Sequence, residues 1–148
     1  MTIESLLFQC PSCKAFNRVM PDRLSAHPKC GKCGKPLTIL KAPVNATSAG
    51  FEDEVLKWPG YVLLEFWSKF CPYCKMVEPV IHDMADWRAG HLKIVKVEIN
   101  EEPGMAQQYK IDSTPTFFLY RKGTQIASMK GAPKEKIELV QWIDRFLK

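Results

Sequence analysis

The sequence predicts an α/β domain with a central mixed sheet flanked by helices, preceded by a small metal-binding module. Three observations support this prediction. The six cysteines of the 148-residue chain fall into three CxxC pairs, two of them near the N-terminus. A nearly continuous apolar run, Tyr61–Trp67, is typical of a strand buried on both faces and leads to the third pair. An amphipathic segment and a second apolar run, Leu92–Ile99, then complete a β-α-β pattern with an expected parallel strand pair.

Composition divides the chain into a predicted metal module, residues 1–42, and a predicted α/β domain, residues 43–148. The first part is rich in Cys, Pro and Lys and lacks long periodic runs. Modules of this size seldom fold without a metal, disulfides or a partner, because they bury too little apolar surface. The second part is long enough to bury a core of its own, and a polar stretch over residues 43–50 is predicted to link the two.

The first two CxxC pairs are predicted to hold one metal ion. Short strands at Leu6–Gln9 and Leu37–Leu40 are expected to lead into and out of two turns, each built around one pair. The spacing C-x2-C-x16-C-x2-C lets the two turns converge on a tetrahedral ion, with Zn–S distances of about 2.3 Å. Four thiolates leave no open position, so we expect a single structural Zn²⁺. The predicted ligands are Cys10, Cys13, Cys30 and Cys33.

The N-terminal segment favours a cytoplasmic location. It reads MTIESLLFQC, has no basic region, and its apolar stretch is too short for a signal peptide. No run approaches the ~18 apolar residues of a membrane span, so no membrane partner is predicted. Thiols stay reduced in the cytosol, which favours zinc over a pair of disulfides. Four sulfurs could also hold iron in a rubredoxin-like site.

Charge and composition exclude several classes of function. The apolar content of 46% excludes a disordered chain. The net charge of +5 is spread along runs of mixed sign, with no stripe of basic and aromatic residues. No nucleic-acid partner is therefore expected. Nothing in the sequence requires more than a monomer.

Apolar periodicity predicts the remaining elements of the longer domain. A short helix, with acidic residues near its positive end, is expected at Phe51–Trp58. The helix after the third CxxC pair spans Lys75–Arg88, and another short helix lies at Gly104–Tyr109. Thr116–Tyr120 and Gln125–Met129 are predicted to form a hairpin around the turn signal Arg-Lys-Gly-Thr.

Two helices are predicted to pack on the sheet through one apolar face each. The last element is an amphipathic helix at Lys134–Leu147. Its core-facing side chains are expected to be Ile137, Val140, Leu147 and either Ile143 or Leu139. Those of the helix after the third CxxC pair are expected to be Met76, Val80, Met84 and Trp87.

The third CxxC pair is predicted to be a redox-active dithiol. Cys71 lies where the buried strand ends and a helix begins, so its sulfur approaches the N–H groups of the first turn. Together with positive charge from Lys69 and Lys75, this setting lowers a thiol pKa from about 8.5 to between about 3.5 and 7.5. Cys74, one turn further on, is expected to stay a thiol. Cys71 is therefore predicted to attack a target disulfide, and Cys74 to resolve the mixed disulfide.

The residues around this dithiol resemble the thioredoxin family. The resemblance rests on EFWSKFCPYCKMVEP, on Ser-Thr-Pro-Thr at 113–116, and on Gly123 and Gly131, and it covers about residues 43–148. With CGKCGKPL and NRVMPDR in the cysteine-rich head, the whole chain is similar to the zinc-containing thioredoxin 2 subgroup. The resemblance implies a thioredoxin fold preceded by a zinc-ribbon module, and the activity of a protein-disulfide reductase.

The resemblance also implies roles for residues outside the CxxC pair. Pro115 matches the family's cis-proline, which turns the backbone of Thr114 toward the substrate. Glu65 takes the place of a buried aspartate and is expected to relay the proton of Cys74, with a raised pKa and Lys96 as its neighbour. The alternative is a Glu–Lys pair that only satisfies the interior. An apolar rim that contacts substrates is implied for Trp67, Phe70, Gly131 and Ala132.

Three positions depart from the family's pattern. The dipeptide between the cysteines is Pro72-Tyr73, as in glutaredoxins, where the family usually has Gly-Pro. Phe70 stands in place of a tryptophan, and Glu65 is one methylene longer than aspartate. A glutaredoxin-like dipeptide is expected to raise the reduction potential by about 40–70 mV, which is about 2–3 kcal/mol in favour of the dithiol.

The leading hypothesis is a cytosolic reductase of disulfide-containing proteins, recycled by thioredoxin reductase or by glutathione. One alternative is a glutathione-coupled disulfide oxidoreductase or isomerase. Another is a redox sensor whose zinc module responds to oxidation. A last alternative treats the zinc module as a binding module for proteins or nucleic acid.

Overall fold

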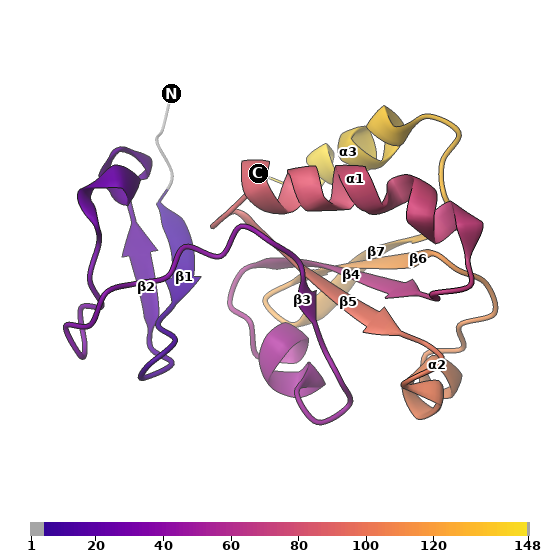
Figure 1. Cartoon of the computed structure of the whole chain (residues 1–148), viewed down its shortest axis with the longest axis horizontal. Helices are drawn as coiled ribbons and strands as arrows, with labels where there is room; N and C mark the ends of the chain where they lie inside the picture. The colour runs from indigo at the N-terminus through magenta and orange to yellow at the C-terminus, as the bar shows by residue number, and fades with distance from the viewer. Residues whose placement is uncertain (1–4, 148) are drawn as a thin grey trace.

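The computed structural model describes residues 5–147, which form a small N-terminal ribbon beside a larger α/β domain (Figure 1). Residues 1–4 and 148, at the outer ends of the two predicted domains, lie outside the described residues. None of the helices found between residues 5 and 147 has the length and apolar character that crossing a bilayer requires.

The N-terminal ribbon is a two-stranded antiparallel sheet of β1 (Leu6–Gln9) and β2 (Phe16–Val19). The prediction of β1 is confirmed, whereas β2 was not predicted from the sequence. The strand predicted at Leu37–Leu40 is wrong, because this part of the ribbon contributes only an isolated bridge between Lys29 and Pro36. A proline has no N–H with which to continue a ladder of hydrogen bonds.

The larger domain is built on a five-stranded mixed sheet with the strand order β3-β5-β4-β6-β7. β3, β5 and β4 are parallel, whereas β6 and β7 are antiparallel to their neighbours, so the predicted mixed sheet is confirmed. Its strands are β3 (Val44–Asn45), β4 (Tyr61–Trp67), β5 (Leu92–Glu98), β6 (Thr116–Arg121) and β7 (Thr124–Lys130). The stretch predicted as a linker therefore contains an edge strand.

Helices cover both faces of this sheet (Figure 1). In chain order the helices are the 3₁₀ helix η1 (Pro21–Ala26) in the ribbon, the π-type helix η2 (Glu52–Leu56), α1 (Pro72–Trp87), α2 (Pro103–Gln108) and α3 (Lys136–Asp144). Successive residues of a strand point to opposite faces. Leu63 of β4 accordingly joins the core under α1 and α3, and Leu64 joins the core under η2 and α2.

Three side chains predicted to face the core lie on the surface. Met76 and Trp87 of α1 are 50% and 64% exposed, and Ile137 of α3 is 56% exposed. Helix α1 instead turns a neighbouring face to the sheet, and the set it buries is Cys74, Val77, Val80, Ile81, Met84 and Ala85. Helix α3 buries Leu139, Val140 and Ile143.

The ribbon is packed against the α/β domain. Leu7 of β1 inserts its side chain into the core under η2, and its backbone N–H donates to the carbonyl of Gly90 at 2.9 Å. Phe16 of β2 meets Trp58 edge to face, with ring centroids 5.2 Å apart. Gly90 has φ +86°, and a Cβ at this position would lie 2.4 Å from Cβ of Leu6. The turn after α1 therefore requires glycine for the close approach of β1.

Candidate active site and metal centre

Cys71 caps the N-terminus of α1, directly after the loop that follows β4. Its backbone is extended, and its Sγ accepts a hydrogen bond from the backbone N–H of Cys74 at 3.1 Å. Pro72 occupies the first turn, where the missing N–H breaks no helical hydrogen bond. The Sγ of Cys71 also lies 3.3 Å from the carbonyl oxygen of Thr114. Both cysteines are buried and neither is in a disulfide.

The surroundings give the two thiols different acidity. Burial alone raises the pKa of Cys71, but hydrogen bonds with the side chains of Cys74 and Thr114 and with the backbone of the first turn outweigh it, so the pKa is lowered. Burial, and next the neighbouring Cys71, raise the pKa of Cys74 to about 12. Hydrogen bonds, and not the charges of nearby lysines, are the main effects that favour the thiolate. Cys71 is therefore the thiol that ionises first.

The loop before β6 lies opposite the dithiol. Its Thr114–Pro115 peptide bond is cis, as the resemblance implied. The N–H of Gly131 donates to the carbonyl of Pro115 at 2.7 Å, and Gly131 has φ +78°, a conformation that favours glycine. Ala132 follows, partly buried against the core under α1 and α3. Thr114, Pro115 and Gly131 thus form one local structure beside Cys71.

An exposed apolar patch surrounds Cys71. Phe70 and Tyr73, on either side of it in the sequence, are 75% and 60% exposed. Met76 shares the helix face of Tyr73 at i,i+3 spacing and extends the patch. Trp67 is placed differently, since its ring packs at 4.4 Å from Nζ of Lys96 and its Nε1 is buried without a hydrogen-bond partner among the described residues.

Glu65 is a buried carboxyl group on the face of the sheet that α1 covers. Its exposed fraction is 1%, and it points to the same side of β4 as Leu63. Its Oε1 has no hydrogen-bond partner within residues 5–147. Burial raises its pKa to about 7, with Lys96 opposing this shift and Glu78 adding to it. The carboxyl group is therefore able to hold or release a proton near neutral pH.

Lys96 is beside Glu65 in the register of β4 and β5, but its ammonium group bonds to Glu78. Nζ of Lys96 donates to Oε1 of Glu78 at 3.4 Å, and that carboxylate also lies 3.6 Å from Nε2 of His82. Glu78 follows Cys74 at i,i+4 spacing on α1. This spacing is the only sequence signal that places Glu78 near the dithiol, and sequence reasoning missed it.

A polar network holds the loop between β4 and α1. Nδ2 of Asn100 donates to Oγ of Ser68 at 2.8 Å and to Oε1 of Glu98 at 3.0 Å. Ser68 in turn accepts from the N–H of Phe70 at its Oγ, at 3.2 Å, and from the N–H of Cys71 at its carbonyl, at 3.1 Å. Ser68 and Asn100 are 32 positions apart, so no local motif reveals this support for the Cys71 loop.

The four ribbon cysteines present a metal-binding geometry. All four Sγ atoms lie within 4.8 Å of one another. The Sγ atoms of Cys10 and Cys33 are 3.7 Å apart, and those of Cys13 and Cys30 are 3.6 Å apart. A tetrahedral site with Zn–S bonds of about 2.3 Å has S···S edges of about 3.8 Å. The sulfur positions therefore fit a Zn²⁺ ion held by four thiolates.

The two cysteine turns share one backbone design. The N–H of Lys14 donates to the carbonyl of Cys10 at 2.9 Å, and the N–H of Gly34 donates to the carbonyl of Cys30 at the same distance. Both donor residues have a left-handed backbone conformation, with φ 67° at Lys14 and φ 76° at Gly34. This repeated turn brings each CxxC pair to the same point from opposite sides.

Groups around Cys30 also favour its thiolate. The backbone N–H of Lys32 lies 3.4 Å from the Sγ of Cys30, and Nδ2 of Asn17 lies 3.5 Å from it. The backbone of Cys33, then Asn17 and then Lys32, lower the pKa of Cys30 to about 6. Asn17 reaches the site from β2 and also accepts from the N–H of Gly31 at 2.9 Å. It is a supporting residue that the cysteine spacing does not reveal.

Comparison with known proteins adds family information to this geometry. A family model described as thioredoxin matches residues 42–145, and one described as the N-terminal zinc ribbon of thioredoxin 2 matches residues 9–35. Thioredoxin C-3 of Corynebacterium nephridii is 30% identical over 142 residues, which cover 96% of each chain. A thioredoxin of Rickettsia felis is 35% identical over 68% of this chain and 95% of its own length. Thioredoxin 1 of a Nostoc species is 35% identical over 73% of this chain and 100% of its own length.

Proposed function

The chain belongs to the thioredoxin family, as a thiol-disulfide oxidoreductase with a zinc-ribbon module. We propose that it reduces protein disulfides through Cys71 and Cys74. The observation that carries the proposal is the difference in acidity within the pair. Hydrogen bonds lower the pKa of Cys71 at the helix N-terminus, whereas burial raises that of Cys74 to about 12.

The proposed reaction proceeds in two exchanges. The Cys71 thiolate attacks one sulfur of the target disulfide, so that a Cys71–target disulfide forms and the other target sulfur leaves as a thiolate, which is then protonated. Cys74 gives up its proton and attacks the Cys71 sulfur, which releases the second target thiol. Two electrons have then passed to the target, and the protein holds a Cys71–Cys74 disulfide.

Glu65 is proposed to accept the proton that Cys74 must lose. A carboxyl group with a pKa of about 7 is about half ionised at neutral pH, which is the condition for an effective general base. Lys96 is proposed to keep part of the Glu65 population ionised, because its charge lowers the pKa of that carboxyl group. Both residues act on the resolving step and leave the first attack to Cys71.

Target proteins are proposed to dock on the apolar patch and on the loop of the cis-proline. An extended target segment would pair with the backbone of Thr114, while Pro115 sets the direction of that backbone. The proposed contact residues are Trp67, Phe70, Pro72, Tyr73, Thr114, Gly131 and Ala132. An apolar surface suits many flexible targets, since it selects for accessible chain and not for one sequence.

Thioredoxin reductase is the proposed electron donor, and the Pro72-Tyr73 dipeptide supports glutathione as the alternative donor. A reduction potential near about −270 mV indicates a general reductant, and one near about −200 mV indicates glutathione-coupled or isomerase chemistry. Measuring the potential of the zinc-loaded protein in glutathione buffers separates these two functions.

The ribbon is proposed to bind one structural Zn²⁺ through its four cysteines. Zinc bound there would supply the folding energy of a module that has little apolar core of its own. Residues 1–42 and 43–148 are proposed as the two domains. The protein is proposed to act as a monomer in the cytoplasm, where reduced thiols suit both sites.

Insulin reduction with defined variants tests the proposed function. With thioredoxin reductase and NADPH, we expect Cys71→Ser to abolish the reduction of insulin. Cys74→Ser is the matched control, and it should keep the first attack and accumulate a mixed disulfide that dithiothreitol releases. Insulin reduction by the Cys71→Ser variant at the wild-type rate would contradict the proposal.

A further inference from the structure

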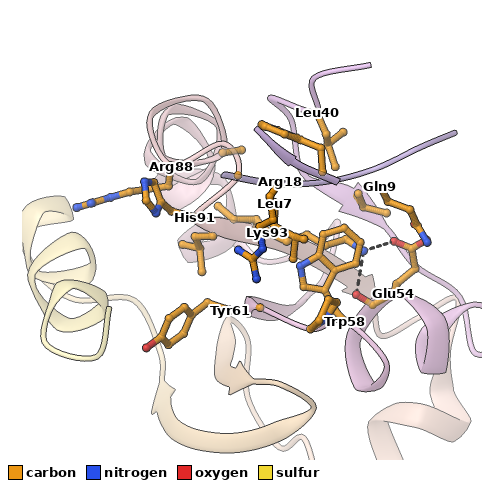
Figure 2. A pocket seen from close by; sticks show the side chains of 18 of the residues that line it. Leu7, Gln9, Arg18, Leu40, Glu54, Trp58, Tyr61, Arg88, His91 and Lys93 are labelled. Atoms are coloured by element: carbon orange, nitrogen blue, oxygen red, sulfur yellow. Dashed lines mark hydrogen bonds and ion pairs between the residues drawn. The ribbon is translucent and has the colours of Figure 1, made fainter. Parts of the chain in front are cut away.

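A cavity of about 540 Å³ lies between the ribbon and the α/β domain (Figure 2). Leu7 of the ribbon and Trp58 and Tyr61 of the domain contribute to its apolar wall. Small-molecule sites usually measure about 300–1,000 Å³, with mostly apolar walls and a few polar groups. Tyr61 begins β4, whereas the dithiol follows the end of this strand, so the cavity and the dithiol lie at opposite ends of β4.

Cationic side chains outnumber carboxylates around this cavity. Its Lys and Arg residues are Lys14, Arg18, Arg88, Lys93, Arg121 and Lys122. Glu54 is the one carboxylate in the described lining, and it pairs with Lys93 at 2.6 Å, as the dashed lines in Figure 2 show. Arg88 pairs with Asp144. Within residues 5–147, the other four cations have no acidic partner.

These four cations line the cavity from both parts of the molecule. Lys14 and Arg18 come from the ribbon, whereas Arg121 and Lys122 come from the end of β6 and the turn that follows it. Like charges around a concave surface reinforce one another's potential and repel one another, which costs stability until an anion binds. The seam between the two parts is therefore complementary to negative charge.

The apolar wall limits which anions fit. The guanidinium of Arg121 lies 5.7 Å from the ring of Tyr61, so a cation and an aromatic ring adjoin at one point of the lining. Nζ of Lys93 lies 3.8 Å from the centre of the Trp58 ring, and Trp58 is among the residues that line the cavity. Leu7 and Trp58 are already buried, so the apolar surface that a ligand can cover belongs to the half-buried Tyr61 and to Leu40, which is 41% exposed. A ligand that only carried charge would leave this surface in contact with water.

We propose that the cavity, hereafter the seam site, binds an organic polyanion with a flat apolar part, of the class of nucleoside diphosphates. Within the described part of the chain these four cations have no acidic partner, which favours more than one negative charge on the ligand. The accessible apolar side chains of the lining, Tyr61 and Leu40, favour a ring over a purely inorganic anion. Because such a ligand contacts both parts at once, its binding holds the ribbon on the domain and raises the melting temperature.

Titration of the full-length, zinc-loaded protein with ADP, adenosine and pyrophosphate tests this proposal. At fixed ionic strength and without magnesium, ADP is expected to bind saturably. Its affinity should be about tenfold or more higher than that of adenosine or of pyrophosphate. Isothermal titration calorimetry gives the affinities, and NMR shifts on the wild-type protein locate the site. Shifts at Arg18 and Tyr61, and not at the dithiol, support the seam site.

Charge removal provides the matched comparison. The double variant Arg18→Ala, Arg121→Ala is expected to weaken ADP binding by about tenfold or more, whereas Arg23→Ala, on η1 outside this cavity, leaves it unchanged. The proposal is overturned by absence of saturable binding at millimolar ADP, by equal affinity for pyrophosphate and ADP, or by wild-type affinity in the double variant. If that variant misfolds, the NMR shifts that ADP causes in the wild-type protein decide instead: shifts away from the cavity would overturn the proposal.

Discussion

Glu65 links the pH of the solution to the stability of the fold. Burial raises the pKa of this carboxyl group from its ordinary value of 4.5 to about 7. Between these two values the folded protein binds more protons at Glu65 than the unfolded chain does, so the contribution of Glu65 to stability falls as pH rises and levels off above about pH 7. Each pKa unit corresponds to about 1.4 kcal/mol, so the total loss is on the order of 3 kcal/mol.

Glu65→Gln is expected to remove this pH dependence, because an amide does not titrate. Urea unfolding of the reduced, zinc-loaded protein between pH 5 and 8.5 measures the slope for wild type and variant. Glu138→Gln, at an exposed position on α3, is the control and should keep the wild-type slope. Equal slopes in the wild type and Glu65→Gln would show that Glu65 ionises freely in the fold.

Glu78 pairs with Lys96, and its negative charge raises the pKa of Glu65. Glu78→Gln removes one negative charge near Glu65 and weakens the bond to Lys96, and both effects favour the Glu65 carboxylate. The pKa of Glu65 is therefore expected to fall below its value of about 7 in the wild type. Carbon NMR of the Glu65 carboxyl group measures it, with Asp83→Asn on the exposed face of α1 as control. An unchanged or higher pKa in Glu78→Gln contradicts this role.

At the scale of single elements, the strength of the periodic signal decides what the sequence could predict. The run Tyr61–Trp67 has seven residues and its strand begins and ends as predicted. β1 and β2 both have four residues, but β1 begins with three apolar residues, whereas the middle of β2 is polar. β2 and the two-residue β3 therefore depend on their partners. Val80 and Met84 fit two adjacent faces of α1, so periodicity alone could not decide whether Met76 or Val77 is buried.

The candidate site also has features that the sequence predicts and features that it does not. The spacing of the cysteines and the position of Cys71 at a strand-to-helix junction follow from the sequence. The contacts that Asn100 and Glu78 make near the dithiol do not follow from the sequence. Both residues contact other elements, and the sequence does not reveal how these elements pack. The same holds for Asn17 in the ribbon, which reaches Cys30 only because β2 pairs with β1.

The two cysteine turns differ in how well their left-handed residue suits its conformation. Gly34→Ala is expected to destabilise the zinc-loaded protein by about 1–2 kcal/mol, because a Cβ is unfavourable at positive φ. Nothing lies within 4 Å of that Cβ, so the loss of stability measures the backbone strain alone and not a steric clash. Lys14→Gly should instead be neutral or stabilise by up to about 1 kcal/mol.

Denaturant unfolding with zinc present measures both changes. Gly104→Ala in α2 is the matched control, since its Cβ also meets nothing within 4 Å and its φ is not positive. It should be neutral or stabilising, because alanine has the higher helix propensity. If Gly34→Ala behaves like Gly104→Ala, the left-handed turn is not a constraint on the ribbon.

At the scale of the whole molecule, the ribbon shares a core with the domain that carries the dithiol. Leu7 is 6% exposed and packs among residues of β4, β5 and η2. The sequence reveals two modules but not this contact, since no motif in either part marks the other as its partner. The ribbon and the domain are therefore expected to unfold together.

Leu7→Ala tests this coupling. The truncation is expected to cost about 2–4 kcal/mol, because it leaves a cavity in a packed core. Leu40→Ala, at a position 41% exposed, is the control and should cost less than about 1 kcal/mol. Loss of stability in the ribbon alone, seen as a separate transition before the domain unfolds, would contradict a shared core.

Cys71 and Cys74 differ in their proposed roles as attacking and resolving thiol, and the pH dependence of alkylation distinguishes them. The reduced, zinc-loaded protein is pulsed with iodoacetamide at pH values from 5 to 9, and mass spectrometry locates the modified cysteine. We expect modification of Cys71 with a midpoint below about pH 8.5, the ordinary thiol pKa, while Cys74 stays unmodified throughout. Modification of Cys74 first, or of both at the same pH, would contradict it.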